Sequence, residues 1–453
     1  MTHKMEPNAK NILVVGLGVS GLAAAELLLD KGFRVRVTES GENEAITGRA
    51  ELLRARGAGV ETGGHTAAFC AGPDLVVVSP GVPRDILPLS IAAEKKVPVI
   101  GEMELGYRYC QAPIIAVTGT NGKTTTTELI GSIMARAGRN TIVCGNIGNP
   151  LCGEIHNIKP GSIVVAEVSS FQLETIVEFR PFISVLLNVT DDHYDRHAGI
   201  EDYKKQKFRI FENQRCGDHA ILHQSLMRDR LVGGILAEKH FYGSGDGMPS
   251  GVRGRMLSID DGAGRKLEIP ADDVPLRGAH NLENAVCSAL AGMLAGADGK
   301  SVKEAIRDFT PLSHRFEKFH EFRGVEYIDD SKATNVDAAK RALESADRKV
   351  VLVAGGIDKG GDYGCMLDIV REKVKAIVVI GEAKDIITKA FSGCVPVHQE
   401  QDMRGAVRKA SSLAEAGEAV MLSPMCSSFD MFSGYKERGE VFQREVKALG
   451  AKQ

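Results

Sequence analysis

A short apolar run that leads into a glycine-rich turn and then a helical pattern most narrows the fold of this chain. The run covers residues 114–117, the turn reads T-G-T-N-G-K-T-T over 118–125, and a helix is expected over 128–137. A strand that enters such a turn and continues as a helix is typical of a phosphate-binding loop. The standard pattern would place a glycine at Val117, whereas here it is Gly119, so the loop is a variant.

Each residue type in this turn has a task in holding a phosphorylated ligand. Glycines let backbone N–H groups close around phosphate oxygens, Lys123 balances phosphate charge, and Thr124 can hold Mg²⁺. The alternative is a structural turn with a solvated lysine. We predict that ATP phosphates are bound by Gly119, Thr120, Asn121, Gly122, Lys123, Thr124 and Thr125.

Strand-length apolar runs followed by helical patterns recur along the chain and predict an α/β fold with parallel sheets. A length of 453 residues exceeds what one core usually supports. We expect a Rossmann-like N-terminal domain over 1–101, a central P-loop domain over 102–311 with a mostly parallel sheet, and a Rossmann-like C-terminal domain over 312–453. Expected strands are 11–16, 34–38, 75–79, 97–100, 114–117, 162–168, 182–187, 350–354, 376–380 and 419–422, with a small antiparallel extension at 255–260 and 265–269. Expected helices include 20–31, 201–213, 336–345, 403–416 and 435–449.

Charge and cysteine usage favour an ordinary cytoplasmic enzyme. The net charge is -3 and charged residues make up 25% of the chain, without the basic excess of a typical nucleic-acid or membrane-surface binder. The nine cysteines are scattered and form no C-x-x-C pair, which suits a reducing compartment. No signal peptide and no run of about 18 apolar residues is found. We therefore expect no nucleic-acid or membrane partner.

A second glycine turn, G-L-G-V-S-G at 16–21, follows the first expected strand, and Glu39 lies near the end of the second. This is the dinucleotide fingerprint, and taken alone it favours a NAD-dependent dehydrogenase. The same geometry can hold any diphosphate at a helix N-terminus. A purely structural turn is the third interpretation.

Two acidic or histidine positions near strand ends are candidates for metal chemistry. Glu167 lies near the end of the strand at 162–168, where carboxylates beside a P-loop commonly coordinate the Mg²⁺ of the nucleotide. His193 lies in the polar run D-D-H-Y-D-R-H after the strand at 182–187. A lone histidine is more often structural, and the lysines of the helix at 201–213 would ordinarily form a solvated face.

Several further runs occur together with the variant loop. They read GNIGNP at 145–150, EVSSFQLE at 167–174, LNVTDDHYDRH at 187–197, GAHNLEN at 278–284, LSHRFE at 312–317, DDSKATN at 329–335 and SPMCSSFDMFSGYKERG at 423–439. Together with the loop they resemble the Mur ligase superfamily, which joins amino acids to bacterial cell-wall precursors and includes the folate polyglutamylating synthetases. The resemblance extends over essentially the whole chain.

The resemblance implies where each substrate binds. The first glycine turn would hold the UDP part of a substrate through Gly18, Ser20, Glu39, Ser40 and Asn146. The family more often has aspartate at the Glu39 position. ATP would also contact Asn281, Asn284, Arg315 and Asp330, although asparagines at a helix start can be mere caps and the charged residues a mere interdomain hinge. The incoming amino acid would contact Thr334, Lys359, Ser428 and Tyr435, which otherwise read as polar loop residues; the family frequently has phenylalanine in place of Tyr435.

The resemblance also implies the metal set and the catalytic residues. Two Mg²⁺ ions would be held by Thr124, Glu167, His193 and Lys207, with Lys207 carried as a carbamate formed with CO₂. Conversion of an ammonium to an anion explains how a lysine could serve beside a cation. The implied catalytic residues are Lys123, His193, Lys207 and Lys332.

The implied reaction joins D-glutamate to UDP-N-acetylmuramoyl-L-alanine through an acyl phosphate, with ATP cleaved to ADP and phosphate. It would be a cytoplasmic step of peptidoglycan precursor synthesis performed by a monomer. A folate polyglutamylating ligase shares the loop and the chemistry, but the DSKATN and SSFDMF runs favour the cell-wall reaction. A dehydrogenase would rest on the first glycine turn alone, and a nucleotide switch on the P-loop alone.

Overall fold

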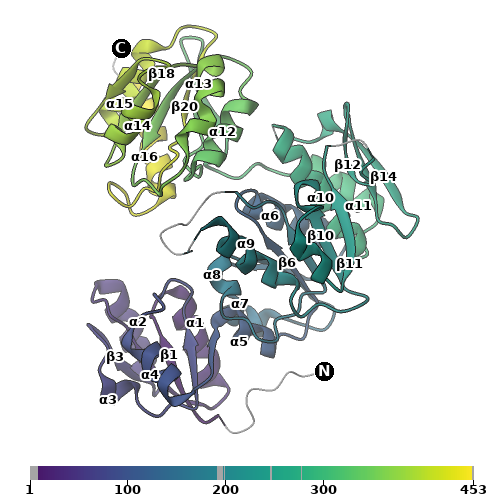
Figure 1. Ribbon diagram of the computed structural model, residues 1–453, viewed down its shortest axis with the longest axis vertical. Coiled ribbons are helices and arrows are strands. Elements are labelled where there is room, and N and C mark those ends of the chain that lie inside the picture. Colours follow the sequence, from purple (N-terminus) through teal and green to yellow (C-terminus); the bar gives the residue numbers. More distant parts are fainter. Residues whose placement is uncertain (1–8, 191–196, 198, 245–246, 277, 451–453) are drawn as a thin grey trace.

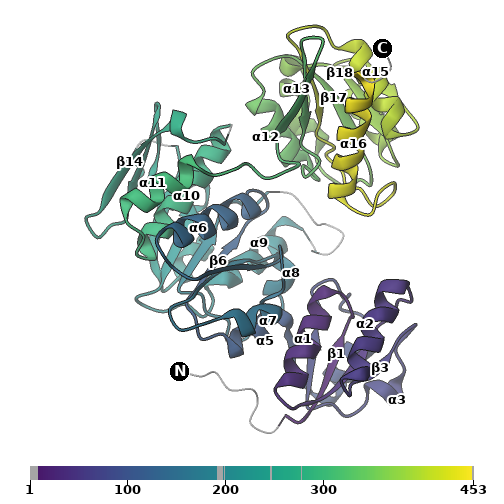
Figure 2. The ribbon, with the colours of Figure 1, turned by 180° about the vertical axis from the view of Figure 1, so that it is seen from behind.

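The chain forms three α/β domains that follow one another from the N-terminus to the C-terminus (Figures 1 and 2). The computed structural model describes residues 9–190, 197, 199–244, 247–276 and 278–450. Each domain is built around its own largely parallel sheet with helices packed against it, which confirms the predicted fold class. Among the described residues, no helix combines the length and the apolarity that a bilayer crossing requires.

The N-terminal domain has a five-stranded parallel sheet in the order β3-β2-β1-β4-β5. From β1 the chain first adds strands on one side of the sheet, β2 and β3, and then on the other, β4 and β5. Such a change of side leaves a crevice at the carboxyl ends of the two strands where it occurs, here β1 and β4. The glycine turn predicted to bind UDP lies at this edge. The elements are β1 (Asn11–Val15), α1 (Val19–Asp30), β2 (Arg34–Thr38), α2 (Glu44–Ala55), β3 (Gly59–Glu61), α3 (Ala67–Cys70), β4 (Leu75–Val78), α4 (Leu87–Lys95) and β5 (Val99–Gly101). The next helix, α5 (Glu102–Tyr109), leads into the central domain.

The central domain has a six-stranded parallel sheet in the order β11-β10-β9-β6-β8-β7 and a separate antiparallel sheet of β12, β13 and β14. The small sheet corresponds to the expected extension, with one further strand. The elements are β6 (Ile114–Thr118), α6 (Lys123–Arg136), β7 (Thr141–Gly145), α7 (Leu151–Glu154), β8 (Ile163–Glu167), α8 (Ser170–Leu173), β9 (Ile183–Leu186), α9 (Ile200–Phe208), β10 (His219–His223), β11 (Glu238–Tyr242), β12 (Gly251–Arg253), β13 (Met256–Asp260), β14 (Lys266–Pro270), α10 (Ala279–Leu294) and α11 (Gly299–Arg307).

The C-terminal domain has a six-stranded sheet in the order β15-β16-β20-β17-β18-β19, in which only the edge strand β15 is antiparallel. Its elements are β15 (Glu317–Phe322), β16 (Val325–Asp329), α12 (Val336–Ser345), β17 (Val350–Gly355), α13 (Leu367–Lys373), β18 (Val374–Ile380), α14 (Lys384–Phe391), β19 (Val397–Gln399), α15 (Met403–Leu413), β20 (Ala419–Leu422) and α16 (Tyr435–Gly450).

Two expected helix boundaries were wrong by five residues each. The helix after the P-loop begins at Lys123 rather than at residue 128, and Gly122, with φ 87°, is its N-cap. Its four threonines have weak helix propensity, but three of them are buried, so packing overrides propensity. The expected helix over 201–213 ends at Phe208 and continues only as a 3-10 turn, Arg209–Phe211. There the Arg209 guanidinium donates to backbone carbonyls of residues 173, 174 and 176.

Candidate active site

The phosphate loop lies at the carboxyl end of β6, in the middle of the central sheet. Asn188, which follows β9, holds its shape: the backbone N–H of Asn121 donates to Asn188 Oδ1 at 2.9 Å, and Asn188 Nδ2 donates to the Asn121 carbonyl at 3.0 Å. Gly119 and Gly122 adopt φ 155° and 87°. Because L side chains rarely adopt such angles, glycine is needed at both positions.

Two lysines converge on one carbonyl oxygen of this loop. Lys123 Nζ donates to the Gly119 carbonyl at 2.9 Å, and Lys207 Nζ, from the end of α9, donates to the same oxygen at 2.8 Å. Lys207 is only 1% exposed, and its Nζ lies 4.3 Å from the centre of the Tyr203 ring. It is therefore not part of a solvated face. Two ammonium groups around one oxygen create an environment that favours an anion.

Glu167, the last residue of β8, has the arrangement expected of a cation ligand. The side chain is 2% exposed, and its Oε1 accepts a hydrogen bond from Asn146 Nδ2 at 2.7 Å. Its buried Oε2 has no hydrogen-bond partner among the described residues. Thr124 and Glu167 line one cavity, which is described below. A carboxylate oxygen of this kind beside a threonine hydroxyl fits Mg²⁺, which prefers oxygen ligands. His193 lies outside the described residues.

A cavity of about 660 Å³ brings the loop of the central domain together with residues of the C-terminal domain. Its lining includes many residues predicted from the sequence: Thr120, Asn121, Gly122, Lys123, Thr124, Asn146, Glu167, Lys207, Arg315, Lys332, Thr334, Lys359, Ser428 and Tyr435. Segments more than 200 residues apart thus share one space. It is also lined by residues that we did not single out: Ser169, Ser170, Phe171, Tyr203, Asn335, Asp358 and Phe429. Ser169, Ser170 and Phe171 lie in the EVSSFQLE run and Phe429 in the C-terminal run, so those runs were the available signal.

The cavity carries an excess of positive charge. Burial, together with the nearby Arg315, Lys123 and Lys359, lowers the pKa of Lys332 to about 7, against the opposing effect of Glu167. The Lys332 Nζ lies 4.0 Å from the centre of the Tyr435 ring. Cations held this closely are stabilised by an anionic ligand.

A smaller cavity of about 90 Å³ adjoins the other side of the loop and includes Asn121, Gly122 and Thr125 in its lining. It brings together the remaining predicted nucleotide contacts: Asn281, Asn284, Arg315 and Asp330. Asn284 Nδ2 donates to Asn281 Oδ1 at 3.2 Å, and Gly278, not either asparagine, is the N-cap of α10. Asp330 accepts hydrogen bonds from the Ser423 hydroxyl and the Phe316 N–H, while burial raises its pKa to about 7.

The predicted UDP contacts of the first domain form a separate group. Gly18 is exposed at the N-cap of α1, and Ser20 lies in the first turn of that helix. Glu39 Oε2 accepts a hydrogen bond from the Leu17 N–H at 2.6 Å, and its Oε1 contacts the Gly41 N–H and the Ser40 hydroxyl. The Glu39 carboxylate thus holds the glycine turn. Of the predicted UDP contacts, only Asn146 lines the central cavity.

Comparisons with known proteins cover all three domains. Profiles described as Mur ligase MurD-like N-terminal domain, Mur ligase middle domain, and Mur ligase glutamate ligase domain match residues 10–101, 117–292 and 314–426. A UDP-N-acetylmuramoylalanine–D-glutamate ligase of Desulfatibacillum aliphaticivorans is 45% identical over 99% of this chain and 100% of its own. A protein of the same name from Pelotomaculum thermopropionicum is 42% identical over 97% of this chain and 98% of its own.

The arrangement of the fold also matches solved structures. The crystal structure of UDP-N-acetylmuramate–alanine ligase MurC from Thermotoga maritima has a TM-score of 0.61 with this chain at 19% sequence identity. The match covers 97% of this chain and 100% of that one. At this identity the likeness concerns the fold.

Proposed function

The chain belongs to the Mur ligase family, among the UDP-N-acetylmuramoylalanine–D-glutamate ligases, and from this premise we propose that it adds D-glutamate to UDP-N-acetylmuramoyl-L-alanine with cleavage of ATP. The observation that carries the proposal is the cavity in which the phosphate loop of the central domain faces cationic side chains of the C-terminal domain. A site of this composition suits a reaction between a nucleotide, a carboxylate and an amino acid.

The reaction proceeds through activation of the substrate carboxylate, which is a poor electrophile at neutral pH. Transfer of the ATP γ-phosphoryl group to a carboxylate oxygen gives an acyl phosphate and ADP. The D-glutamate amine attacks the acyl carbon, the tetrahedral intermediate collapses, and phosphate leaves to give the amide. Lys123, Arg315 and Lys332 neutralise the phosphate charge that is shared between the donor and the acceptor oxygens during this transfer.

The family uses ATP with Mg²⁺, and the donor set fits this ion. Thr124 and Glu167 would hold one Mg²⁺, and His193 with a carbamate formed on Lys207 would hold a second. When bound, Mg²⁺ offsets phosphate charge and orients the reacting oxygens. Burial of Lys207 beside Lys123 supports the carbamate, because an anion is more favourable than a second ammonium in that position.

The remaining contacts divide among the three substrates. The nucleoside part of ATP lies in the smaller cavity near Asn281, Asn284 and Asp330. The UDP part of the acceptor lies at the first glycine turn, with Gly18, Ser20, Glu39, Ser40 and Asn146 as contacts. D-glutamate is held by Thr334, Lys359, Ser428 and Tyr435, which supply an ammonium and hydroxyl donors suited to carboxylates.

The chain divides at residues 101 and 311 into a UDP-substrate domain, an ATP domain and an amino-acid domain. Each domain binds a different substrate, so the three domains must close on one another to complete the active site. The protein acts as a cytoplasmic monomer. Its nine cysteines form no disulfide among the described residues, which is compatible with a reducing compartment.

An isotope-transfer experiment tests the chemical course. The acceptor carboxylate is labelled with ¹⁸O, and the released phosphate is analysed by mass spectrometry after one turnover. One ¹⁸O atom in the phosphate is expected, because the carboxylate oxygen that attacks phosphorus leaves with it. Phosphate without the label, formed together with the amide, would contradict an acyl phosphate.

A further inference from the structure

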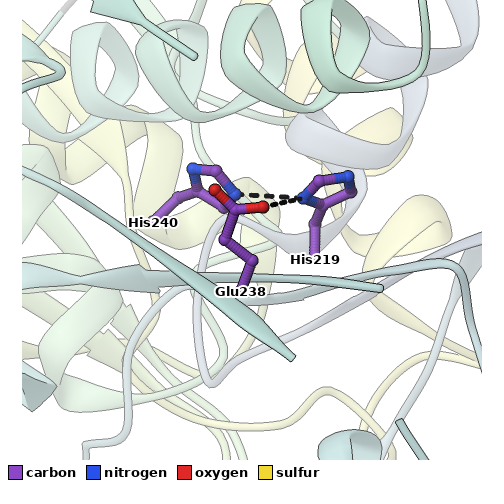
Figure 3. A group of neighbouring side chains, drawn as sticks. All are labelled: His219, Glu238 and His240. Carbon is purple, nitrogen blue, oxygen red and sulfur yellow. Dashed lines mark hydrogen bonds and ion pairs between the residues drawn. The ribbon is translucent and has the colours of Figure 1, made fainter. Parts of the chain in front are cut away.

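Three potential metal ligands lie together at the outer edge of the central sheet (Figure 3). His219 is the first residue of β10, and Glu238 and His240 are the first and third residues of β11. The parallel register pairs His219 with Glu238 and Ile221 with His240. Since side chains alternate along a strand, all three point from the same face of the sheet.

The three ligand atoms have separations that suit one small cation. His219 Nδ1 lies 3.1 Å from His240 Nε2 and 3.7 Å from Glu238 Oε2, and the ligand atoms all lie within 4.8 Å of one another. Tetrahedral Zn²⁺ with bonds of about 2.0–2.1 Å separates its ligands by about 3.3 Å. The backbone already places the side chains at the spacing that such an ion requires.

Hydrogen bonds cannot satisfy both close contacts of His219 Nδ1 at once. His219 Nδ1 is the common atom of both contacts, and a neutral imidazole carries at most one proton there, which it can direct well to only one partner.

The surroundings leave one side of the group open. His240 is 8% exposed, whereas the Glu238 side chain is 59% exposed. The Phe182 ring packs nearly perpendicular to the His219 ring, at a centroid distance of 5.4 Å and an interplanar angle of 83°. The neighbouring Asp261 carboxylate accepts a hydrogen bond from Arg265 Nε at 2.6 Å.

We propose that His219, Glu238 and His240 form a binding site for a divalent transition-metal ion of the Zn²⁺ class. The site lies at the amino ends of β10 and β11, whereas the phosphate loop lies at the opposite, carboxyl end of β6, which is two strands away from β10 in the sheet. The ion is therefore structural. It ties the outermost strand β11 to β10 and protects an exposed sheet edge.

Calorimetric titration of the full chain with Zn²⁺, with Mg²⁺ in excess, tests the proposal. The wild type is expected to bind one equivalent tightly, and His219→Asn, Glu238→Gln and His240→Gln each to lower the affinity of that equivalent at least about tenfold. The Glu238 side chain is exposed, so its variant keeps the fold. His156→Gln is the matched control, since His156 is an exposed imidazole beside Asp30 and should leave Zn²⁺ affinity unchanged.

Co²⁺ provides a second readout that reports on the ligands. Visible d–d absorption without a thiolate charge-transfer band is expected in the wild type and is lost in the His219→Asn/His240→Gln double variant. Equal Zn²⁺ affinity in the wild type and in all three ligand variants would overturn the proposal. So would a Co²⁺ spectrum that shows thiolate ligation, because the ion would then sit elsewhere.

Discussion

At the scale of single residues, Lys207 carries the most specific claim about the site. Lys207→Arg keeps the positive charge but cannot form a carbamate, so kcat should fall on the order of 10²–10³-fold, the range seen when one charge-stabilising group is lost. A coupled assay of ADP formation measures it. Lys205→Arg on the exposed face of the same helix is the control and should remain active. Near-normal turnover of Lys207→Arg would show that catalysis does not require a carbamate on Lys207.

Asp330 should give stability a pH dependence of its own. Its folded-state pKa is raised to about 7, above the ordinary 3.8. The folded protein therefore holds a proton that the unfolded chain has lost, and the resulting stability is complete below about pH 4 and lost as the pH rises through about 7. Asp330→Asn should flatten the fall in Tm of the C-terminal domain between about pH 5 and about pH 7.

Calorimetric scans of the wild type and the Asn variant across that interval make the comparison. The interval ends near pH 7 because Lys332, whose pKa is lowered to about 7, contributes the opposite slope above it. Asp347→Asn, an exposed change in the same domain, should keep the wild-type slope. Parallel plots of Tm against pH for the wild type and Asp330→Asn would show that the Asp330 carboxyl does not cause the pH dependence.

The predictability of site residues from sequence depended on whether they are contiguous. The loop from Gly119 to Thr125 is a continuous run whose residue types each have a task, so its position could be read directly. Asn188 holds the loop from 67 residues away; it lies in the LNVTDDHYDRH run, but that run did not indicate a contact with the loop. Similarly, Asp337 accepts a hydrogen bond from Asn121 Nδ2 at 2.7 Å across the domain boundary, a contact that only the folded chain creates.

At the scale of elements, several strands that are apolar along their whole length were predicted, whereas some strands that carry charged residues were missed, including the fully buried β16, which reads VEYID. Strands such as β6 and β20 are apolar and buried along their whole length, and their expected bounds were nearly those observed. The edge strand β15 reads EKFHEF with no fully buried position, and β11 reads EKHFY. Charged edge strands lack the apolar run that marks a buried one, so both were missed.

The first glycine turn offers a matched pair of tests. A methyl group on Gly21 would lie 1.8 Å from the Gly16 carbonyl oxygen, whereas one on Gly18 would meet nothing within 4 Å. Gly21→Ala should therefore destabilise the N-terminal domain by about 1–3 kcal/mol, the usual cost of overpacking. Gly18 has φ -69°, which alanine adopts without strain, so Gly18→Ala should leave Tm unchanged.

The Gly18→Ala variant separates folding from ligand binding. If the diphosphate of the substrate approaches the backbone at Gly18, the added methyl group should raise KM for the UDP-linked acceptor several-fold and leave KM for ATP unchanged. Steady-state kinetics with each substrate varied in turn measures both. An unchanged KM for the UDP-linked acceptor would show that its diphosphate does not bind against the backbone at Gly18.

At the scale of the whole molecule, the active site exists only where domains meet. The large cavity takes the phosphate loop and Glu167 from the central domain, and Lys332, Lys359 and Ser428 from the C-terminal domain. Sequence patterns could predict three α/β domains from alternating strands and helices. They could not give the distances between domains, because each domain is built mainly around its own core and the contacts between domains join residues far apart in the sequence, such as Cys152 packed against the N-terminal core.

Phosphate release from ATP and Mg²⁺ by the purified protein, measured with each other substrate omitted in turn, is the decisive assay of the proposed reaction. Release sustained over many turnovers should require both UDP-N-acetylmuramoyl-L-alanine and D-glutamate, with one amide formed per phosphate. Sustained release in the absence of UDP-N-acetylmuramoyl-L-alanine, or in the absence of D-glutamate, would contradict the assignment of this cavity to amide-bond formation.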